Sequence, residues 1–321
     1  MQIQTIFINE FGRLRSGWRF AMFFFAFTIF GASLGAAAKI LLSNLAIDFS
    51  PGSLLFILAN SAISLFLAIF LGWFCGKFLE GLPFRALGCW FTKNWLKDLC
   101  LGLTAGAGAI IFAVLIAVTL GGLSFQTNQT AGTSAILLTL GVSLAAFAVA
   151  AAFEEAFFRG YILQTFARAN LAWLAVALTS VFFAAVHLGN QGATLISTLN
   201  TALAGIWFGI AYLKTRNLWF PFGLHLAWNW LQGAFFGIEV SGITNLTTAP
   251  FLREIDAGPI WLTGENYGIE GGIACTVALI GSGLAIWFAP FLKPPEEMLV
   301  LTSQEKFSEA LMRKNVGAEK I

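Results

Sequence analysis

Two adjacent glutamates stand inside an apolar stretch of the chain, one helical turn before an arginine. They are Glu154 and Glu155 in the run F-E-E-A-F-F-R, which ends at Arg159. On a helix, Glu155 and Arg159 share a face, so the arginine can neutralise this carboxylate in an apolar environment. Glu154 points about 100° away, given ~3.6 residues per turn. It has no obvious partner nearby in the sequence and is available as a general base, unless both glutamates are only ion-paired packing elements.

The chain contains two histidines, and both lie in apolar stretches. His187 closes the run F-A-A-V-H, in which Phe183 lies one turn earlier. His225 and Asn229 are four residues apart in H-L-A-W-N, so they share one face of a helix. A single histidine of this kind is commonly just a hydrogen-bonded residue. Because ionisable groups in hydrocarbon are costly and usually mark function, two histidines with a carboxylate pair predict a catalytic or coordinating site within the bilayer.

Composition places these residues in a membrane protein. Hydrophobic residues make up 58% of the 321-residue chain and charged residues 11%, with a mean hydropathy of +0.81. Soluble domains are about 45–50% apolar, so a soluble enzyme is excluded. The segments that approach membrane-spanning length are 18–42, 53–76, 99–120, 134–157, 171–188, 194–213, 219–238 and 271–292. We therefore predict an all-α fold, a polytopic transmembrane bundle of about eight helices.

The basic residues predict the orientation of this bundle. With the N-terminus inside, 16 of the 18 basic residues fall on the inner side; the others are Lys39, near the outer end of the first span, and Arg253, in an outer loop. This bias follows the positive-inside rule and predicts that both termini are cytoplasmic, with a bacterial cytoplasmic membrane as the expected location. The lipid bilayer is then one partner. No P-loop, dinucleotide fingerprint or nucleic-acid-binding patch appears, so we expect no nucleic-acid partner.

Three regions follow from the spans and their connections. Residues 1–133 hold the N-terminal helices, and within them 77–98 mix aromatic with basic residues, which is typical of an amphipathic segment on the inner membrane surface. Residues 134–238 carry the glutamates and both histidines and form the predicted catalytic core. Residues 239–321 comprise an outer loop, the last span and a cytoplasmic tail. The acidic loop 239–270 either guards a site or is simply solvated.

Helix geometry predicts that the glutamates and His187 converge. If the fourth and fifth spans form an antiparallel hairpin turning near Ala169–Asn170, Glu154 lies about 16 residues before the turn and His187 about 17 after it. Both then stand roughly 25 Å from the turn, at ~1.5 Å per residue. His225 reaches the same level only if this hairpin projects into the cytoplasm. We therefore expect such a projection, and a site that opens inward.

The order of these motifs resembles a known family. E-E-x-x-x-R, F-x-x-x-H and H-x-x-x-N occur at residues 154–159, 183–187 and 225–229, on successive apolar segments. This pattern is similar to that of the CPBP family, the CAAX-type prenyl proteases and bacteriocin-processing or immunity proteins also called the Abi family. The resemblance covers about 134–238, and each motif alone is weak. The three in order, using both histidines of the chain, are fairly specific.

The resemblance implies an intramembrane endopeptidase that hydrolyses peptide bonds of membrane-associated proteins or peptides near the cytoplasmic face. Glu154, helped by His187, would activate water for attack on the scissile carbonyl. His225 and Asn229 would hold the developing oxyanion. Together with Glu155 and Arg159, these four residues are the expected catalytic set.

The same resemblance leaves a metal open. Glu155 and Arg159 would brace the helix in either version. In the metal version, His187, His225 and Glu154 would supply the three protein ligands of a catalytic zinc ion, with water in the fourth position. No other cofactor is expected.

Two other functions remain open. One is a non-proteolytic immunity or scaffold protein of the same family, although such a protein need not keep Glu154, His187, His225 and Asn229 together. The other is a proton-coupled transporter with a relay of buried ionisable groups. The sequence has no evident inverted repeat, which disfavours a transporter.

Overall fold

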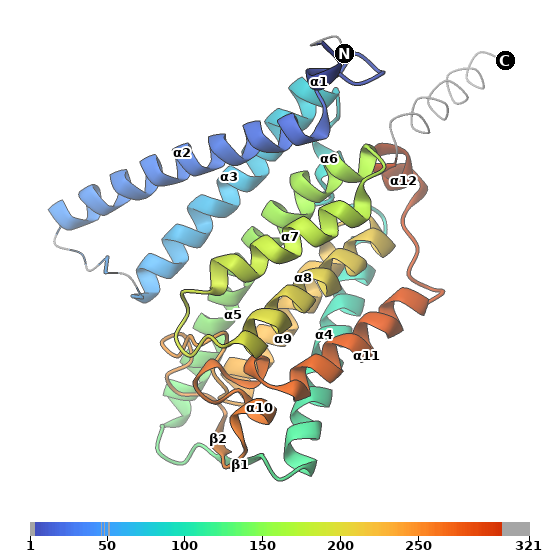
Figure 1. The fold of residues 1–321 in the computed structure, drawn as a ribbon. Helices are drawn as coiled ribbons and strands as arrows, with labels where there is room; N and C mark the ends of the chain where they lie inside the picture. Colours follow the sequence, from blue (N-terminus) through green and yellow to red (C-terminus); the bar gives the residue numbers. More distant parts are fainter. Residues whose placement is uncertain (1–3, 46, 48, 51, 304–321) are drawn as a thin grey trace.

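The computed structural model describes residues 4–303 except 46, 48 and 51. The chain folds as an all-α bundle of long helices, with a small two-stranded sheet at one end (Figure 1). The helices that correspond to the eight apolar segments are α2 (Ser16–Asn44), α3 (Leu54–Glu80), α4 (Trp95–Thr119), α5 (Thr133–Glu155), α7 (Ala172–His187), α8 (Leu195–Thr215), α9 (Trp219–Trp230) and α11 (Ile273–Phe288). The fold class predicted from the sequence is confirmed.

Shorter elements extend or connect these helices. Two π-helical turns, η2 (Ala156–Ile162) and η3 (Leu231–Phe235), continue α5 and α9. The remaining elements are α1 (Gln4–Phe7), η1 (Phe84–Leu87), β1 (Leu123–Thr127), α6 (Leu163–Arg168), β2 (Leu252–Asp256), α10 (Ile260–Thr263), η4 (Glu265–Tyr267), η5 (Ile269–Gly271) and α12 (Glu296–Thr302).

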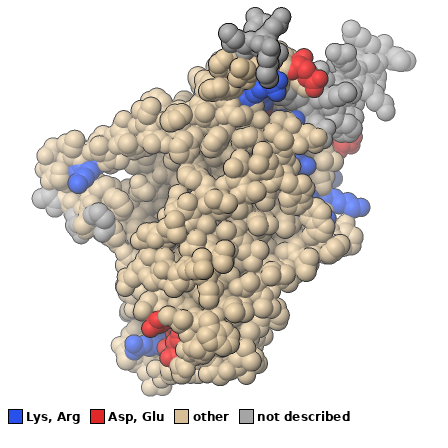
Figure 2. Space-filling model, viewed as in Figure 1, with Lys and Arg blue, Asp and Glu red and all other residues tan. Residues whose placement is uncertain are grey.

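Five helical segments are long and apolar enough to cross a membrane. They are α2, α3, α4, the continuous stretch 133–168 and α8. The helices α7 and α11 are apolar but have 16 residues each, fewer than the roughly 20 that a straight span needs. Figure 2 shows charged side chains at the two ends of the molecule and near the far end of α2, with a broad uncharged band between. This band fits a membrane, while the number of full spans stays a prediction.

Glycine allows α4 and α9 to pack closely. Gly102 and Gly106 lie one turn apart on α4, directly against the backbone carbonyls of Phe220 and Leu224 on α9. A side chain at either glycine would collide with those carbonyls, so the helices could not approach as they do. Small residues at this spacing are the usual means of close helix contact in membranes. The contact holds α9, which carries His225, at a fixed position in the bundle.

A buried ion cluster ties α2 and α6 to the end of α3. Arg19 donates to Glu80 at 2.7 Å, and Arg168 donates to both oxygens of the same carboxylate at 2.7 and 2.8 Å. All three side chains are at most 4% exposed. Charges removed from water need such direct pairing, so this cluster fixes the three helices relative to one another.

The sheet lies at the opposite end from α12 (Figure 1). β1 pairs antiparallel with β2, with Leu123 opposite Asp256 and Thr127 opposite Leu252. The strand pair joins the α4–α5 connection to the acidic loop 239–270. This loop is therefore held to the bundle, a feature that the predicted helices alone did not indicate. We call this end, with β1, β2 and residues 239–272, the sheet end.

The predicted amphipathic segment 77–98 does not form one surface helix. Residues up to Glu80 continue α3, and α4 begins at Trp95. Gly81, with φ of 69°, ends α3 in the left-handed conformation, and Pro83 follows it. These two residues break the helix, so only a short connection with one turn of 3-10 helix remains between the spans. The predicted cytoplasmic tail continues into 304–321, outside the described residues.

Candidate active site

A single cavity collects the residues that the sequence analysis selected for chemistry. It has a volume of about 270 Å³, and Glu154, His187, His225 and Asn229 all contribute to its wall. These side chains come from α5, α7 and α9. Most of the remaining wall is apolar and aromatic, including Phe183. Polar groups that converge in an apolar pocket are the usual form of an active site.

The glutamate–arginine pair forms as predicted, at the junction between α5 and η2. Arg159 Nη1 donates to Glu155 Oε1 at 3.1 Å, and its Nη2 donates to the carbonyl of Gly205 on α8 at 3.1 Å. Both side chains are at most 1% exposed, and the guanidinium faces three phenylalanine rings at 4.9–5.5 Å. π-Helical turns are rare and often occur at functional sites. Here the turn begins directly after Glu155.

His225 lies between the two glutamates. Its Nδ1 is 3.0 Å from Glu155 Oε1, and its Nε2 is 3.6 Å from Glu154 Oε2. A carboxylate oxygen can only accept, so Nδ1 carries the proton of that hydrogen bond. The ring also stacks on Phe208 with centroids 4.5 Å apart. The glutamate pair therefore contacts His225. The sequence had instead predicted that Glu154 lies near His187, because both are equally far from the hairpin turn.

His187 occupies another part of the cavity wall, at the C-terminal end of α7. Its Nδ1 lies 2.7 Å from the backbone carbonyl of Phe183, one turn earlier. Because a carbonyl only accepts, Nδ1–H is the donor and Nε2 is left for other partners. The imidazole also packs on the Phe183 ring at 4.7 Å. The F-x-x-x-H spacing thus both orients the ring and fixes its tautomer.

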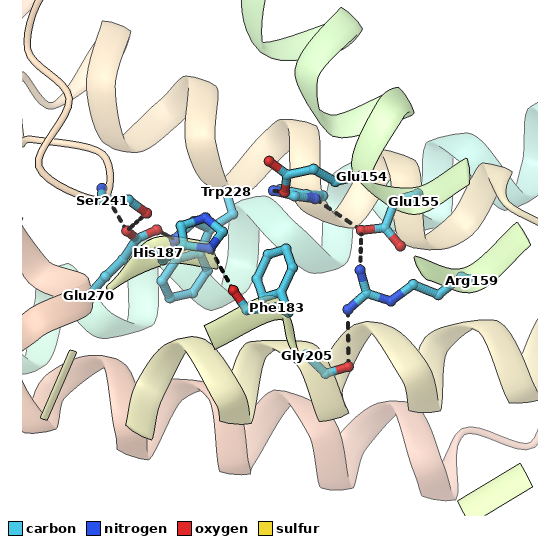
Figure 3. A network of polar contacts seen from close by, with 10 residues as sticks. Glu154, Glu155, Arg159, Phe183, His187, Gly205, Trp228, Ser241 and Glu270 are labelled. Carbon is cyan, nitrogen blue, oxygen red and sulfur yellow. Dashed lines mark hydrogen bonds and ion pairs between the residues drawn. The ribbon is translucent and has the colours of Figure 1, made fainter. Parts of the chain in front are cut away.

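A third carboxylate, Glu270, joins the cavity wall beside His187 and was not selected from the sequence (Figure 3). It accepts from the Ser241 backbone N–H at 2.8 Å, from the Ser241 hydroxyl at 2.6 Å and from Trp228 Nε1 at 3.0 Å. Burial raises the pKa of Glu270, while these donors and His187 oppose the rise. No motif marks this residue, because an acidic residue directly before an apolar segment is common.

The sheet end also supplies the outer part of the wall. Val240, Ser241 and Leu246 line the cavity together with Glu270. Asn190, just beyond α7, donates to the Ser241 carbonyl at 2.9 Å and links the 188–194 turn to this loop. The acidic loop therefore contributes to the cavity wall. The sequence had left open whether this loop guards a site or is simply solvated.

The direction in which the site opens, expected to be cytoplasmic, stays a prediction. The cavity lies toward the sheet end, which the basic residues assign to the outer side. The helix α7 ends at His187, so this histidine lies far from the turn at 169–171, and it lines the cavity together with Ser241 and Glu270 of the loop 239–272. Counting residues from the hairpin turn predicted that these residues lie at one height in the bundle. It could not show on which side of them the cavity lies.

The predicted hairpin between the fourth and fifth apolar segments is confirmed. α6 ends at Arg168 and α7 begins at Ala172, with Asn170 between them at φ of 62°. Glu155 lies about three and a half turns before this hairpin end, and His225 lies less than two turns into α9. Since the two side chains meet, the hairpin must extend beyond the start of α9, as predicted.

The residues present do not form the three-ligand zinc set. Both histidines have Nδ1 committed to an oxygen, an orientation that would suit metal binding through Nε2. However, within the described part of the chain, no three His, Cys, Asp or Glu side chains gather closely enough to hold a metal ion. Zinc binding by His187, His225 and Glu154 stays a prediction.

Comparison with known families agrees with the motifs. Residues 135–231 match the family described as type II CAAX prenyl endopeptidase Rce1-like. The matched segment contains all three motifs, so the resemblance stated from them is confirmed over this segment. No curated protein matches the chain. The long apolar helices make the chain an integral membrane protein, and its segment 135–231 is similar to the type II CAAX prenyl endopeptidase family.

Proposed function

We propose that the protein is an intramembrane endopeptidase that hydrolyses peptide bonds of membrane-associated substrates with a water activated by glutamate. The observation that carries the proposal is the bridge from Glu155 through His225 to Glu154 in the wall of a cavity. Glu154 is the exposed end of this bridge, with its side chain 23% exposed. It is therefore the carboxylate that water can reach.

Glu154 acts as the general base in this proposal. It takes a proton from water as the oxygen attacks the scissile carbonyl, and it returns the proton to the leaving amine. His187 assists through Nε2, since its Nδ1–H is held by the Phe183 carbonyl. General acid–base groups of this type contribute about 10²–10⁴-fold to a rate, provided that they reach the reacting atoms directly or through one water.

His225 and Asn229 hold the oxyanion that forms during attack. They lie one turn apart on α9, and both line the cavity. Glu155 accepts the Nδ1–H of His225, so Nε2 faces the substrate side, and this nitrogen donates to the oxyanion when the imidazole is doubly protonated. Arg159 in turn holds Glu155 and anchors it to α8. Donors fixed in advance stabilise a developing charge without reorganisation.

The proposal is tested by cleavage of a membrane-inserted peptide reporter with purified protein in detergent or vesicles. Wild type should cleave it, and Glu154→Ala should not. The matched control is Glu265→Ala, which removes an exposed glutamate of the sheet end and should leave turnover unchanged. Folded wild-type protein that cleaves no membrane peptide would favour the immunity, scaffold or transporter alternatives.

The metal question needs its own experiment. If no zinc is involved, chelators leave the rate intact and metal analysis of active protein finds less than one zinc per chain. If zinc is essential, His187→Ala and His225→Ala each lose bound metal together with activity, since only two of three ligands remain. Loss of activity on chelation, restored by zinc, would overturn the metal-free version.

A further inference from the structure

Asn60 is a polar residue of the long apolar helix α3 that the proposed mechanism does not use. It lines the cavity together with Ile57 and Ser61. These three residues follow the i, i+3, i+4 spacing of one helix face, so this face of α3 forms part of the wall. The cavity therefore has a polar wall residue on a helix that carries none of the three motifs.

The side-chain amide of Asn60 makes no hydrogen bond to the described part of the protein, which distinguishes it from the other two asparagines of the wall. Asn200 donates to two backbone carbonyls of the sheet end at 2.8 and 2.9 Å and accepts from Thr276 at 2.6 Å. Asn229 belongs to the proposed oxyanion set. Asn60 is exposed, and an amide without a partner in an apolar environment costs free energy. A bound ligand can supply the partner.

The height of Asn60 in the bundle follows from the contacts of α3 with the helical stretch that carries the glutamates. A Cβ added at Gly72 would lie 3.3 Å from the Cβ of Tyr161, and the ion pair between the end of α3 and α6 lies further along both chains. The residue numbers differ by 89 in the first contact and by 88 in the ion pair, so the two stretches run parallel. Asn60 is therefore level with residues 148–149, which is roughly 8 Å before Glu154 at ~1.5 Å per residue.

A peptide in this cavity needs hydrogen-bond partners for its own backbone. A peptide bond in a helix is shielded by the turns around it, so the substrate must be locally extended where Glu154 directs the water. Its N–H and C=O groups then lose their intrahelical partners, which is costly in an apolar environment. A carboxamide offers both a donor and an acceptor, and can bond to such a backbone. An extended chain advances ~3.3 Å per residue, so 8 Å corresponds to about two or three residues.

On the basis of the proposed function, we propose that Asn60 is a substrate-binding residue that hydrogen-bonds the backbone of the extended substrate two or three residues from the scissile bond. The contact uses groups that every peptide carries. It therefore positions the chain relative to Glu154 and is independent of the substrate side chains. The helix α3 in this way takes part in the site through a single residue, opposite the motif helices in sequence but in the same wall.

The test is a double-mutant cycle between Asn60 and the backbone of a probe peptide. The probe is an N-acetylated apolar dodecapeptide with a free C-terminus, and each analogue replaces one backbone amide with an ester, which removes one N–H donor. Affinities are measured with detergent-solubilised Glu154→Ala protein, so that no probe is consumed. Adding Asn60→Leu should weaken binding about three- to tenfold, as expected for one or two hydrogen bonds.

The coupling identifies the contact. An ester at one position of the probe should weaken binding when Asn60 is present and should have no further effect in Asn60→Leu, because the two changes remove the same interaction. Asn60→Gln keeps the amide on a longer side chain and should retain part of this coupling. If every ester acts equally in the two proteins, Asn60 does not bond to the backbone and the inference fails.

A matched control removes a polar group from another span. Thr104→Val takes a hydroxyl from α4, outside this cavity, and should leave all affinities unchanged. Asn60→Leu is close in size to the original residue and removes an unpartnered amide, so the unfolding temperature should not fall. If Thr104→Val weakens binding as much as Asn60→Leu, or if Asn60→Leu lowers the unfolding temperature together with the affinity, a general effect on the bundle explains the loss and the inference fails.

Binding and cleavage distinguish this inference from the proposed function. In a protein that cleaves the membrane reporter, Asn60→Leu should raise KM about three- to tenfold and leave kcat nearly unchanged, since the contact holds substrate and transition state alike. A coupled ester in a protein that never cleaves the reporter would support backbone binding by Asn60 and reject proteolysis. Cleavage without any coupled position would support proteolysis and reject the inference. If no probe binds, the inference also fails.

Discussion

The cluster around Glu80 and the cluster around Glu155 both hold a glutamate against arginine inside the bundle. Glu80 has both oxygens bonded to guanidinium groups, from Arg19 and Arg168. Glu155 has one arginine partner, Arg159, and shares the same oxygen with His225. The other oxygen of Glu155 is buried without a hydrogen-bond partner among the described residues.

The two clusters also differ in net charge and in access. Two arginines face one glutamate around Glu80, whereas around Glu155 two glutamates face one arginine and a histidine. The second glutamate, Glu154, opens to the cavity. Saturated pairing holds helices together, while an excess carboxylate at a cavity can do chemistry. Residue type alone does not distinguish a structural cluster from a catalytic one. The following experiments test whether the difference in ion pairing distinguishes the Glu80 cluster from the Glu155 cluster.

Glu154→Gln should have the largest effect on activity. The amide cannot accept the proton of the attacking water, so kcat should fall about 10²–10⁴-fold. Measurement of reporter cleavage and of the unfolding temperature in detergent checks this, with Glu265→Gln as the control. Because Glu154 is partly exposed and Arg159 is bonded to Glu155, stability should change little. A stable Glu154→Gln protein with normal turnover would remove this residue from the mechanism.

Glu80→Gln should show the opposite pattern. It leaves two buried arginines without a counter-charge, and breaking a buried ion pair costs about 3–5 kcal/mol. The unfolding temperature should therefore fall markedly. The folded fraction should keep kcat within about threefold of wild type, as judged by activity per folded molecule. Normal stability with lost turnover would show that the Glu80 cluster takes part in catalysis and that the comparison is wrong.

Asn229→Ala tests the oxyanion role in the cavity wall. Loss of one oxyanion donor should lower kcat about 10²–10³-fold with a smaller effect on KM. Asn229→Asp is a useful companion, because it keeps the size of the side chain but replaces the donor with a negative charge. It should be at least as inactive as Asn229→Ala. Recovery of activity in the aspartate variant would contradict donation by Asn229.

Glu155→Gln is the sharpest test of the difference between the two clusters, and we expect a moderate effect on stability. The amide can still accept from His225 or Arg159 but no longer balances the guanidinium, so stability should fall by about 1–3 kcal/mol. Residual turnover should remain in the folded fraction, since Glu154 is intact. Well-folded Glu155→Gln protein without turnover would mean that the roles of the two glutamates are exchanged or that both act in catalysis.

Glu254 in β2 gives the smallest expected effect and concerns stability alone. Burial, with Glu239 and Asp256 nearby, raises the pKa of Glu254 from 4.5 to about 8. The folded state then favours the protonated form, so its stabilising contribution is complete below pH 4.5 and is lost as pH rises to about 8. Unfolding temperatures across this range should fall with pH, and Glu254→Gln should flatten the curve. An unchanged curve would show that Glu254 titrates normally.

Much of the fold could be predicted from the sequence because membrane segments are defined by local composition. All eight apolar segments correspond to helices, and the turn at Ala169–Asn170 lies where the hairpin required it. The pairing of Glu155 with Arg159 followed from their i,i+4 spacing. These features depend on residues near one another in the chain, so helix periodicity is sufficient to find them.

Only the tertiary structure decided how the site is assembled. His225 contacts Glu155 from 70 positions away, and Glu270 reaches Trp228 and Ser241 from another segment. The cavity also lies toward the sheet end, because loop residues and not helix levels determine where space is left. Periodicity fixes which face of a helix a residue occupies. The neighbour of that face depends on how the helices and loops pack, and a single sequence does not encode that packing locally.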